Sequence, residues 1–342
     1  MTNLELTYSP YNLSLSQPFM TSKGEIKERK GFIISLKSIK KAEGLGEAAP
    51  LPEFGSESYE DDEKALEKIS LRLKIDLNNP VSSIEENLSG FNHLPALKSG
   101  LEQAILNLIC IEKKTTLSEL FHKPVSKNIL VNGVIGLLDK NSAVNRAREL
   151  RLRGFRTLKI KAGRENFEDD LAVIKGIRDE VGKNINLRLD ANGRWDINDS
   201  IQYCKQLEQF EPEYIEQPTS LVNNFEKISR ETRIPLAADE SIRSHSDAAD
   251  IINNKLSSVL ILKPMMLGGL TTTLRIIEKA EEQNLKVVIT SSFETSIGRS
   301  AAVFAAAALR SQTAHGLAVA EFFKDTIVND PFPVENGMIN IG

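Results

Sequence analysis

The 342-residue chain is poor in cysteine, tryptophan and histidine, with two, one and four residues of these types. Cys110 and Cys204 are far apart, so they form neither the CxxC spacing of a thiolate metal site nor a disulfide framework. No histidine pair has metal-ligand spacing, and no GxxxxGK[ST], GxGxxG or HExxH motif occurs. These absences argue against a phosphate-binding loop, a dinucleotide-binding fold and a zinc hydrolase.

The chain also lacks a long stretch of one charge and a long apolar run. Its 43 basic and 47 acidic residues leave a net charge of −4, which predicts no nucleic-acid partner. The first residues lack the basic and apolar segments of a signal peptide, and no later run is long enough to span a bilayer. We therefore expect a cytoplasmic protein without membrane contact; the sequence leaves open whether it forms a homo-oligomer.

Two patterns of secondary structure divide the chain. Residues 1–122 predict an α+β capping domain, with a Gly/Pro-rich loop at 44–58, an amphipathic helix at 59–74 and a buried helix at 101–113. Residues 123–322 alternate short apolar runs with amphipathic helices, and 323–342 form a C-terminal segment that we expect to return to the cap. The fold class is α/β, a (β/α)₈-type (TIM-like) barrel with a cap. Its eight strands are predicted near 129–134, 156–161, 185–190, 213–216, 235–238, 258–262, 286–290 and 313–317.

Polar residues recur at the carboxyl ends of these predicted strands, where barrel enzymes place their active sites. The first five lie 29, 26, 23 and 24 residues apart, which is close to one strand plus one helix. One such residue alone is typical of a helix N-cap or a turn, but the recurrence predicts one shared site. The series contains Lys161, Asp190, Glu216, Asp239, Lys263, Ser291, Ser292 and Gly316, with His315 expected to be structural.

Three consecutive members of the series are the carboxylates Asp190, Glu216 and Asp239. Converging carboxylates repel one another, so one is protonated or a cation lies among them. All-oxygen ligands favour Mg²⁺, with Mn²⁺ as a substitute. Lys159 and Lys161 lie on one face of their strand; because a neighbouring ammonium and a metal disfavour a second ammonium, we expect Lys161 to have a lowered pKa and to act as a base.

Five motifs resemble, in order, those of the muconate lactonising subgroup of the enolase superfamily. They are KIK (159–161), DANG (190–193), IEQP (215–218), ADES (238–241) and LKP (262–264). The resemblance extends to the cap at 44–58 and to the tail at 331–341. It implies Mg²⁺ held by Asp190, Glu216 and Asp239, with Lys161 and Lys263 as acid/base lysines acting on a small-molecule carboxylate.

Within the subgroup, residues 291–298 and 314–318 are similar to o-succinylbenzoate synthases. These enzymes dehydrate 2-succinyl-6-hydroxy-2,4-cyclohexadiene-1-carboxylate in menaquinone or phylloquinone biosynthesis. The resemblance then implies that Lys161 removes the proton α to the carboxylate and that Lys263 stabilises the intermediate. Supporting roles are expected for Lys159 beside Lys161, Asn192 and Arg188 at the metal site, Ser291 or Ser292 and Gly316 near the succinyl chain, and Phe19 and Met20 as a lid.

Two alternatives remain at this point. The first is an N-acylamino acid racemase or a dipeptide epimerase of the same superfamily, in which Lys161 and Lys263 act as bases on opposite faces. Dipeptide epimerases typically carry an Asp-x-Asp after the eighth strand, whereas this chain has no acid from residue 314 until Glu321. The second alternative is a non-catalytic metal-binding barrel.

Overall fold

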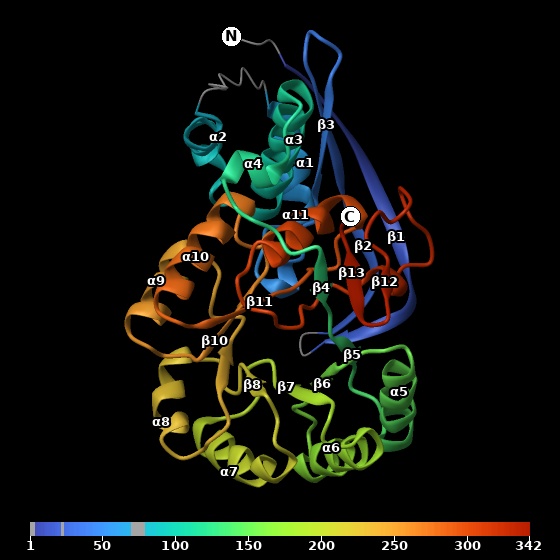
Figure 1. Ribbon diagram of the computed structural model, residues 1–342, viewed down its shortest axis with the longest axis vertical. Coiled ribbons are helices and arrows are strands. Elements are labelled where there is room, and N and C mark those ends of the chain that lie inside the picture. The colour runs from blue at the N-terminus through green and yellow to red at the C-terminus, as the bar shows by residue number, and fades with distance from the viewer. Residues whose placement is uncertain (1–3, 22–23, 70–78) are drawn as a thin grey trace.

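The computed structural model describes residues 4–21, 24–69 and 79–342, and it consists of a cap above a barrel (Figure 1). The cap contains an antiparallel sheet with the strand order β1-β2-β3. Its long strands β1 and β2 run from the cap down beside the barrel (Figure 1). The cap elements are β1 (Glu5–Thr21), β2 (Gly24–Lys37), β3 (Glu43–Ala48), α1 (Tyr59–Lys68), α2 (Pro80–Leu88), α3 (Pro95–Lys113) and α4 (Leu117–Phe121).

The loop predicted over 44–58 begins instead as strand β3. Gly44 and Gly46 suit this strand because helix α3 packs directly onto it. A Cβ atom at Gly46 would lie 2.0 Å from the carbonyl oxygen of Gly100, and one at Gly44 would lie 2.1 Å from that of Ala104. The two glycines therefore serve close packing of backbone on backbone, rather than a turn. Helix α1 ends at Lys68 and Ile69 is extended, so the helix predicted over 59–74 is too long by at least that residue; positions 70–74 lie outside the described residues.

The barrel is a curled parallel sheet of seven strands, in the order β11-β10-β9-β8-β7-β6-β5. The predicted strand at 129–134 is divided in two, because its first part pairs with the tail and its second with β6. The expected eighth strand at 313–317 is reduced to two isolated parallel bridges, from Gly316 to Thr290 and from His315 to Val131, which connect the two edges of the sheet. The strands are β4 (Asn128–Leu130), β5 (Gly133–Ile135), β6 (Thr157–Lys161), β7 (Asn186–Asp190), β8 (Tyr214–Glu216), β9 (Leu236–Ala238), β10 (Val259–Leu262) and β11 (Lys286–Ile289).

Helices surround the barrel and begin at the end where its strands stop (Figure 1). Several start at a polar side chain that accepts a backbone N–H of the first turn, as Asp139 does for α5 and Asp196 for α7. In the described part of the chain, none of the helices is both long and apolar enough to cross a membrane. The barrel helices are α5 (Lys140–Leu152), α6 (Phe167–Val181), α7 (Ile197–Leu207), α8 (Phe225–Ser229), α9 (His245–Asn253), α10 (Leu270–Glu282) and α11 (Ser296–Ala307).

The C-terminal tail touches both parts of the molecule. Phe323 forms an antiparallel bridge with Leu15 of β1. Further on, β12 (Val334–Glu335) and β13 (Met338–Asn340) form a small antiparallel sheet with β4. The domain boundaries predicted from the sequence, at 122 and 322, stay a prediction.

Two buried glutamates of the cap bind the first turns of barrel helices. Glu47 of β3 accepts hydrogen bonds from the backbone N–H of Thr295 (2.9 Å) and Gly298 (2.8 Å) at the start of α11. Glu102 of α3 accepts from the N–H (2.8 Å) and the hydroxyl of Thr271 at the start of α10. A carboxylate is favoured at the positive end of a helix dipole, so these contacts hold the cap over the barrel.

Candidate active site

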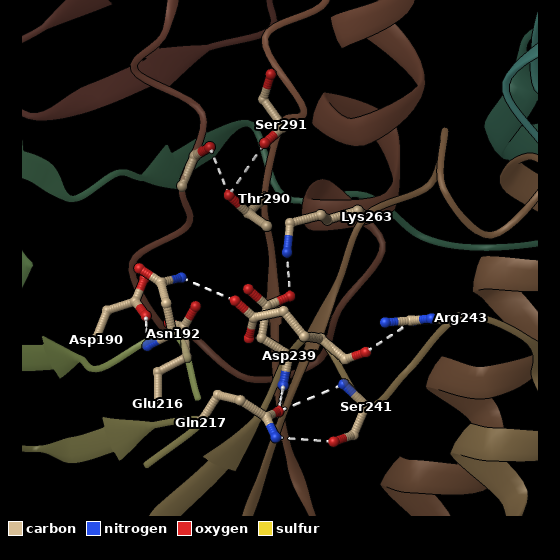
Figure 2. A network of polar contacts seen from close by, with 12 residues as sticks. Asp190, Asn192, Glu216, Gln217, Asp239, Ser241, Arg243, Lys263, Thr290 and Ser291 are labelled. Atoms are coloured by element: carbon tan, nitrogen blue, oxygen red, sulfur yellow. Dashed lines mark hydrogen bonds and ion pairs between the residues drawn. The ribbon is translucent and has the colours of Figure 1, made fainter. Parts of the chain in front are cut away.

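A cavity lies at the carboxyl ends of the barrel strands, below the cap. It has a charged side made by strand ends and an apolar side made by the cap and by loops. Figure 2 shows part of the charged side, with Lys263 above Asp239 and with Thr290 and Ser291 nearby. The lining residues are Phe19, Glu53, Phe54, Asn132, Val134, Lys159, Lys161, Asn192, Asp239, Glu240, Lys263, Thr290, Ser291, Phe293, Gly316, Val319 and Phe322.

Lys159 and Lys161 of β6 point into this cavity and share one carboxylate. The Nζ atom of Lys161 is 2.8 Å from Oδ2 of Asp190 and 2.8 Å from Oδ1 of Asn192. The Nζ atom of Lys159 contacts the same Oδ2 atom at 2.8 Å and Oε1 of Glu216 at 2.6 Å. Strands β6, β7 and β8 pair in register at Lys161, Asp190 and Glu216, which brings these groups together. Lys161 thus has an acid and an amide that fix its ammonium group at the cavity wall.

Lys263, at the end of β10, forms an ion pair with Asp239, at the end of β9 (Figure 2). The ammonium group also lies 5.4 Å from the centre of the Phe54 ring. Asp239 is held by Gln217, whose Oε1 accepts the backbone N–H of Asp239 at 3.0 Å. The Nε2 atom of Gln217 donates to the hydroxyl of Ser241 (2.8 Å), so this one amide fixes the loop that carries Asp239 (Figure 2).

The three acids differ in the direction in which their surroundings shift their pKa values. Burial alone would raise the pKa of Asp190, but the Lys159 and Lys161 ammonium groups outweigh it and hold that pKa below its usual value. For Glu216, burial and the negative charge of Asp190 raise the pKa well above its ordinary range. Burial opposes the charged form of Lys263, but Asp239 outweighs it and raises the pKa of Lys263. Glu216 therefore favours its protonated form despite the nearby ammonium groups.

The donor set suits a hard divalent cation. Asp190, Glu216 and Asp239 stand on adjacent parallel strands, and each is nearly or fully buried. The Oε2 atom of Glu216 is buried without a hydrogen-bond partner in the described part of the chain. Within the same residues, however, no three acids, histidines or cysteines are arranged around a common metal position. The lysine ammonium groups contact the carboxylates instead. In charge and donor type, the three carboxylates fit Mg²⁺.

Four phenylalanine side chains form the apolar side of the cavity. The ring centre of Phe19 in β1 lies 4.8 Å from that of Phe293 and 5.4 Å from that of Phe322. Phe54 is the fourth member of the cluster, and its ring centre lies 6.4 Å from that of Phe293. Such tilted and edge-on contacts stabilise the cluster beyond simple burial. A planar, mostly apolar ligand suits this wall.

Most of the site residues expected from the sequence are brought together here, with three exceptions. Arg188 lies below the acids, and its guanidinium binds Glu213 (2.7 Å) rather than a group at the predicted metal site. The reason is register, because Arg188 stands two residues before Asp190 and so belongs to a deeper layer of the barrel interior. Ser292 is buried but does not line the cavity. The side chain of Met20 lies outside the described residues.

Several cavity residues were not found from the sequence. Glu240 follows Asp239 and accepts the amide of Asn192 at 2.8 Å, and the ADES motif was a signal for it. Phe54 and Phe322 stand outside the predicted strands, and Asn132 lies within the first predicted strand rather than at its carboxyl end, so no sequence signal marked them. His315 is structural as expected: its Nδ1 accepts the N–H of Ile289, and burial lowers its pKa to about 3.

Comparisons with known proteins agree with this geometry. A family model described as "Enolase C-terminal domain-like" matches residues 142–342, and one described as "MenC, N-terminal domain" matches residues 4–107. An o-succinylbenzoate synthase of Thermobifida fusca is 33% identical over 221 residues, which are 64% of this chain and 68% of that protein. A hydrophobic dipeptide epimerase of Enterococcus faecalis is 27% identical over 88% of this chain and 86% of its own.

Among solved structures, a dipeptide epimerase from Enterococcus faecalis, complexed with Mg and the dipeptide L-Leu-L-Tyr, superimposes with a TM-score of 0.92. It is 25% identical, and the match covers 100% of this chain and 98% of that one. The L-Ala-D/L-Glu epimerase of Bacillus subtilis superimposes with a TM-score of 0.89 at 22% identity, covering 100% and 97% of the two chains. These structures share the complete fold of cap and barrel.

Proposed function

The chain belongs to the enolase superfamily, and on that premise we propose that it acts as an o-succinylbenzoate synthase. The observation that carries the proposal is the apolar part of the cavity wall formed by Val319 and Phe322. The charged side of the same cavity carries Lys161 and Lys263. The wall suits a six-membered ring better than the charged amino group of a dipeptide. The proposed reaction is the dehydration of 2-succinyl-6-hydroxy-2,4-cyclohexadiene-1-carboxylate to 2-succinylbenzoate, a cytoplasmic step of menaquinone or phylloquinone synthesis.

In this reaction Lys161 acts as both base and acid. Its neutral amine removes the proton α to the ring carboxylate, and the resulting ammonium donates that proton to the departing hydroxyl group, which leaves as water. The Asp190 and Asn192 oxygens, each 2.8 Å from Nζ, aim the amine at the substrate. Lys263 remains an ammonium paired with Asp239 and stabilises negative charge that develops on the substrate.

Asp190, Glu216 and Asp239 would hold Mg²⁺, or Mn²⁺ in its place. When bound, the ion supplies positive charge that stabilises the developing negative charge on the substrate's carboxylate oxygens. The protein's own part is to keep these acids buried at adjacent strand ends, with Gln217 fixing the last of them at 3.0 Å. The unpartnered oxygen of Glu216 supports this role.

A second candidate is racemisation or epimerisation of an N-acylamino acid or dipeptide. It is favoured by the placement of Lys161 at the end of β6 and of Lys263 at the end of β10, because strands β7, β8 and β9 lie between them. Two lysines so placed can serve as bases on opposite faces of a substrate carbon. In this reaction the proton removed from one face is replaced from the other, and no water leaves.

The test is to incubate the purified protein with the cyclohexadiene acid and to follow formation of the aromatic product, with and without a chelator. In parallel, hydrophobic dipeptides and N-succinyl amino acids are incubated in D₂O and examined by NMR for α-deuterium. We expect rapid, chelator-sensitive aromatisation. Deuterium incorporation into the amino acid derivatives without any aromatic product would select the second candidate. Stabilisation by Mg²⁺ with neither reaction would indicate a non-catalytic barrel.

A further inference from the structure

Asn132 lies at the bottom of the cavity and has no role in the mechanism above. It immediately precedes β5, in which Val134 pairs with Lys159 of β6. Since side chains alternate along a strand, Asn132 shares the inward face of Val134 but lies one layer deeper. It is 1% exposed and lines the cavity. The residue is therefore a buried polar group at the floor of the substrate site.

The orientation of the Asn132 amide follows from its contact with Arg188. The Nη1 atom of Arg188 lies 3.4 Å from Oδ1 of Asn132. A guanidinium can only donate hydrogen bonds, so the amide must turn its oxygen toward Arg188 and its NH₂ group away. In the described part of the chain, this Nδ2 atom is buried without a hydrogen-bond partner. A buried donor left in this state costs free energy unless a water or a ligand satisfies it.

Arg188 is itself fixed firmly enough to hold the amide. Its Nε donates to Glu213 at 2.7 Å, Nη1 to the carbonyl of Ala314 at 2.6 Å, and Nη2 to the hydroxyl of Thr313 at 2.9 Å. The guanidinium carbon also lies 5.0 Å from the centre of the Tyr214 ring. The side chain is 1% exposed. It thus connects the barrel interior to Asn132 and adds a positive charge behind it.

We propose that Asn132 is a substrate-binding residue whose Nδ2 donates a hydrogen bond to a carboxylate or carbonyl oxygen of the substrate, and that Arg188 is its positioning residue. The inference rests on the proposed function, because it assigns a contact to the same acidic substrate. It also gives Arg188 a role other than the one expected at the metal site. The oxygen bound is either that of a carboxylate or that of the succinyl ketone, which share the same acceptor chemistry.

The test measures the binding of 2-succinylbenzoate by calorimetry, together with kcat and KM for the dehydration. Asn132→Leu removes the donor at similar volume, Asn132→Ser retains a donor, and Asn184→Leu changes an exposed asparagine as the control. We expect Asn132→Leu to weaken product binding and to raise KM by about 10- to 100-fold, the effect of losing a hydrogen bond to a charged group. Asn132→Ser should recover part of this loss, and the melting temperature should stay within a few degrees of wild type.

Two further arms locate the contact. Binding of 2-butanoylbenzoate, which lacks the side-chain carboxylate, should be equal in wild type and Asn132→Leu if Asn132 binds that carboxylate, and unequal if it binds another oxygen. Arg188→Lys should raise KM less than Asn132→Leu does, and the double variant should be no worse than Asn132→Leu alone, since both act through one hydrogen bond. Additive losses would overturn the positioning role of Arg188.

The two proposals fail in different ways. A wild-type protein that converts the substrate, together with an Asn132→Leu variant of unchanged KM and product affinity, overturns this inference and leaves the proposed function intact. A wild-type protein that neither converts the substrate nor binds the product overturns the proposed function, and this inference with it.

Discussion

The two sides of the cavity are built in opposite ways. The charged side comes from consecutive strands of one sheet, in which register alone places Lys161 beside Asp190. The apolar side comes from segments far apart in the chain, and it brings Phe19 of the cap against Phe322, which immediately precedes the tail. Groups that move protons thus stand on rigid strands, whereas groups that enclose the ligand stand on the cap and on loops. We therefore expect changes on the charged side to lower kcat and changes on the apolar side to raise KM.

The largest expected effect on turnover is that of Lys161→Ala. Loss of the base should lower kcat by about 10³-fold or more, because positioned acid/base groups contribute in this range. Single-turnover kinetics with the cyclohexadiene acid measure it, and Lys175→Ala, a change in an exposed lysine paired with Asp179, is the matched control. A Lys161→Ala variant with a near wild-type rate would refute the assigned chemistry.

Removal of divalent cations should abolish turnover reversibly. A chelator is expected to stop aromatisation, and millimolar Mg²⁺ or Mn²⁺ to restore it. Binding should also stabilise the fold by about 2.7 kcal/mol at 100 times the dissociation constant, as seen in a rise of the melting temperature. Glu216→Gln should lose most of that rise because it removes one negative charge from the donor set. An unchanged melting temperature in the wild-type protein on addition of Mg²⁺ would contradict the assignment of the three acids.

On the apolar side, Phe322→Ala should raise KM by about tenfold, the effect of removing part of a buried aromatic contact. Its ring contacts those of Phe19 and Phe293, which belong to the apolar side, so kcat should change less than threefold. Phe121→Ala is the control, because Phe121 pairs with Phe304 away from the cavity. A large fall in kcat with unchanged KM would show that the apolar side does not act mainly on KM.

The smallest effect on turnover is expected for Glu102→Gln, at the joint between cap and barrel. Burial raises the pKa of Glu102 to about 7, so the folded state binds this proton more tightly than the unfolded state does. The stability that it contributes is therefore present at low pH and is lost as pH rises from about 4.5 to 7, by up to about 3 kcal/mol.

Urea unfolding at pH 5 and pH 8 tests the sign of this pH dependence of stability. The Glu102→Gln variant should gain stability relative to wild type as pH rises, with kcat nearly unchanged. Glu119→Gln, in which the altered carboxylate is exposed, serves as the control. A stability difference between wild type and Glu102→Gln that does not vary with pH would exclude Glu102 as the titrating group.

Much of the molecule followed from local pattern. The family inferred from five short motifs is confirmed by the match over residues 142–342, and the barrel with a cap is confirmed by the superposition on related structures. Seven of the predicted strands correspond to strands of the curled sheet, because apolar runs followed by amphipathic helices leave few other arrangements. The assigned roles of the individual site residues stay predictions until the variants are made.

The errors had physical causes that a local pattern does not contain. Gly44 and Gly46 indicated a turn but serve the close approach of α3, which depends on a helix more than 50 residues further along the chain. The segment at 313–317 has a strand-like composition, yet only two of its residues form bridges. Arg188 was expected at the metal site, but it stands two residues before Asp190 on β7, and that spacing along a strand places it in a separate layer of the barrel.

The lysine pair Lys159 and Lys161 shows where the sequence is sufficient and where it is not. The sequence by itself determined that charges converge at a barrel mouth. One predicted strand carries two lysines on one face, and three acids follow it at the βα period. Register in a parallel sheet is local and repetitive, so these side chains meet at one end of the barrel. Only the tertiary structure decided that Lys159 joins Asp190 to Glu216, that Asn132 faces the cavity floor and that four phenylalanines cover it. Those contacts join segments distant in the chain, and their geometry is fixed by packing of the whole molecule.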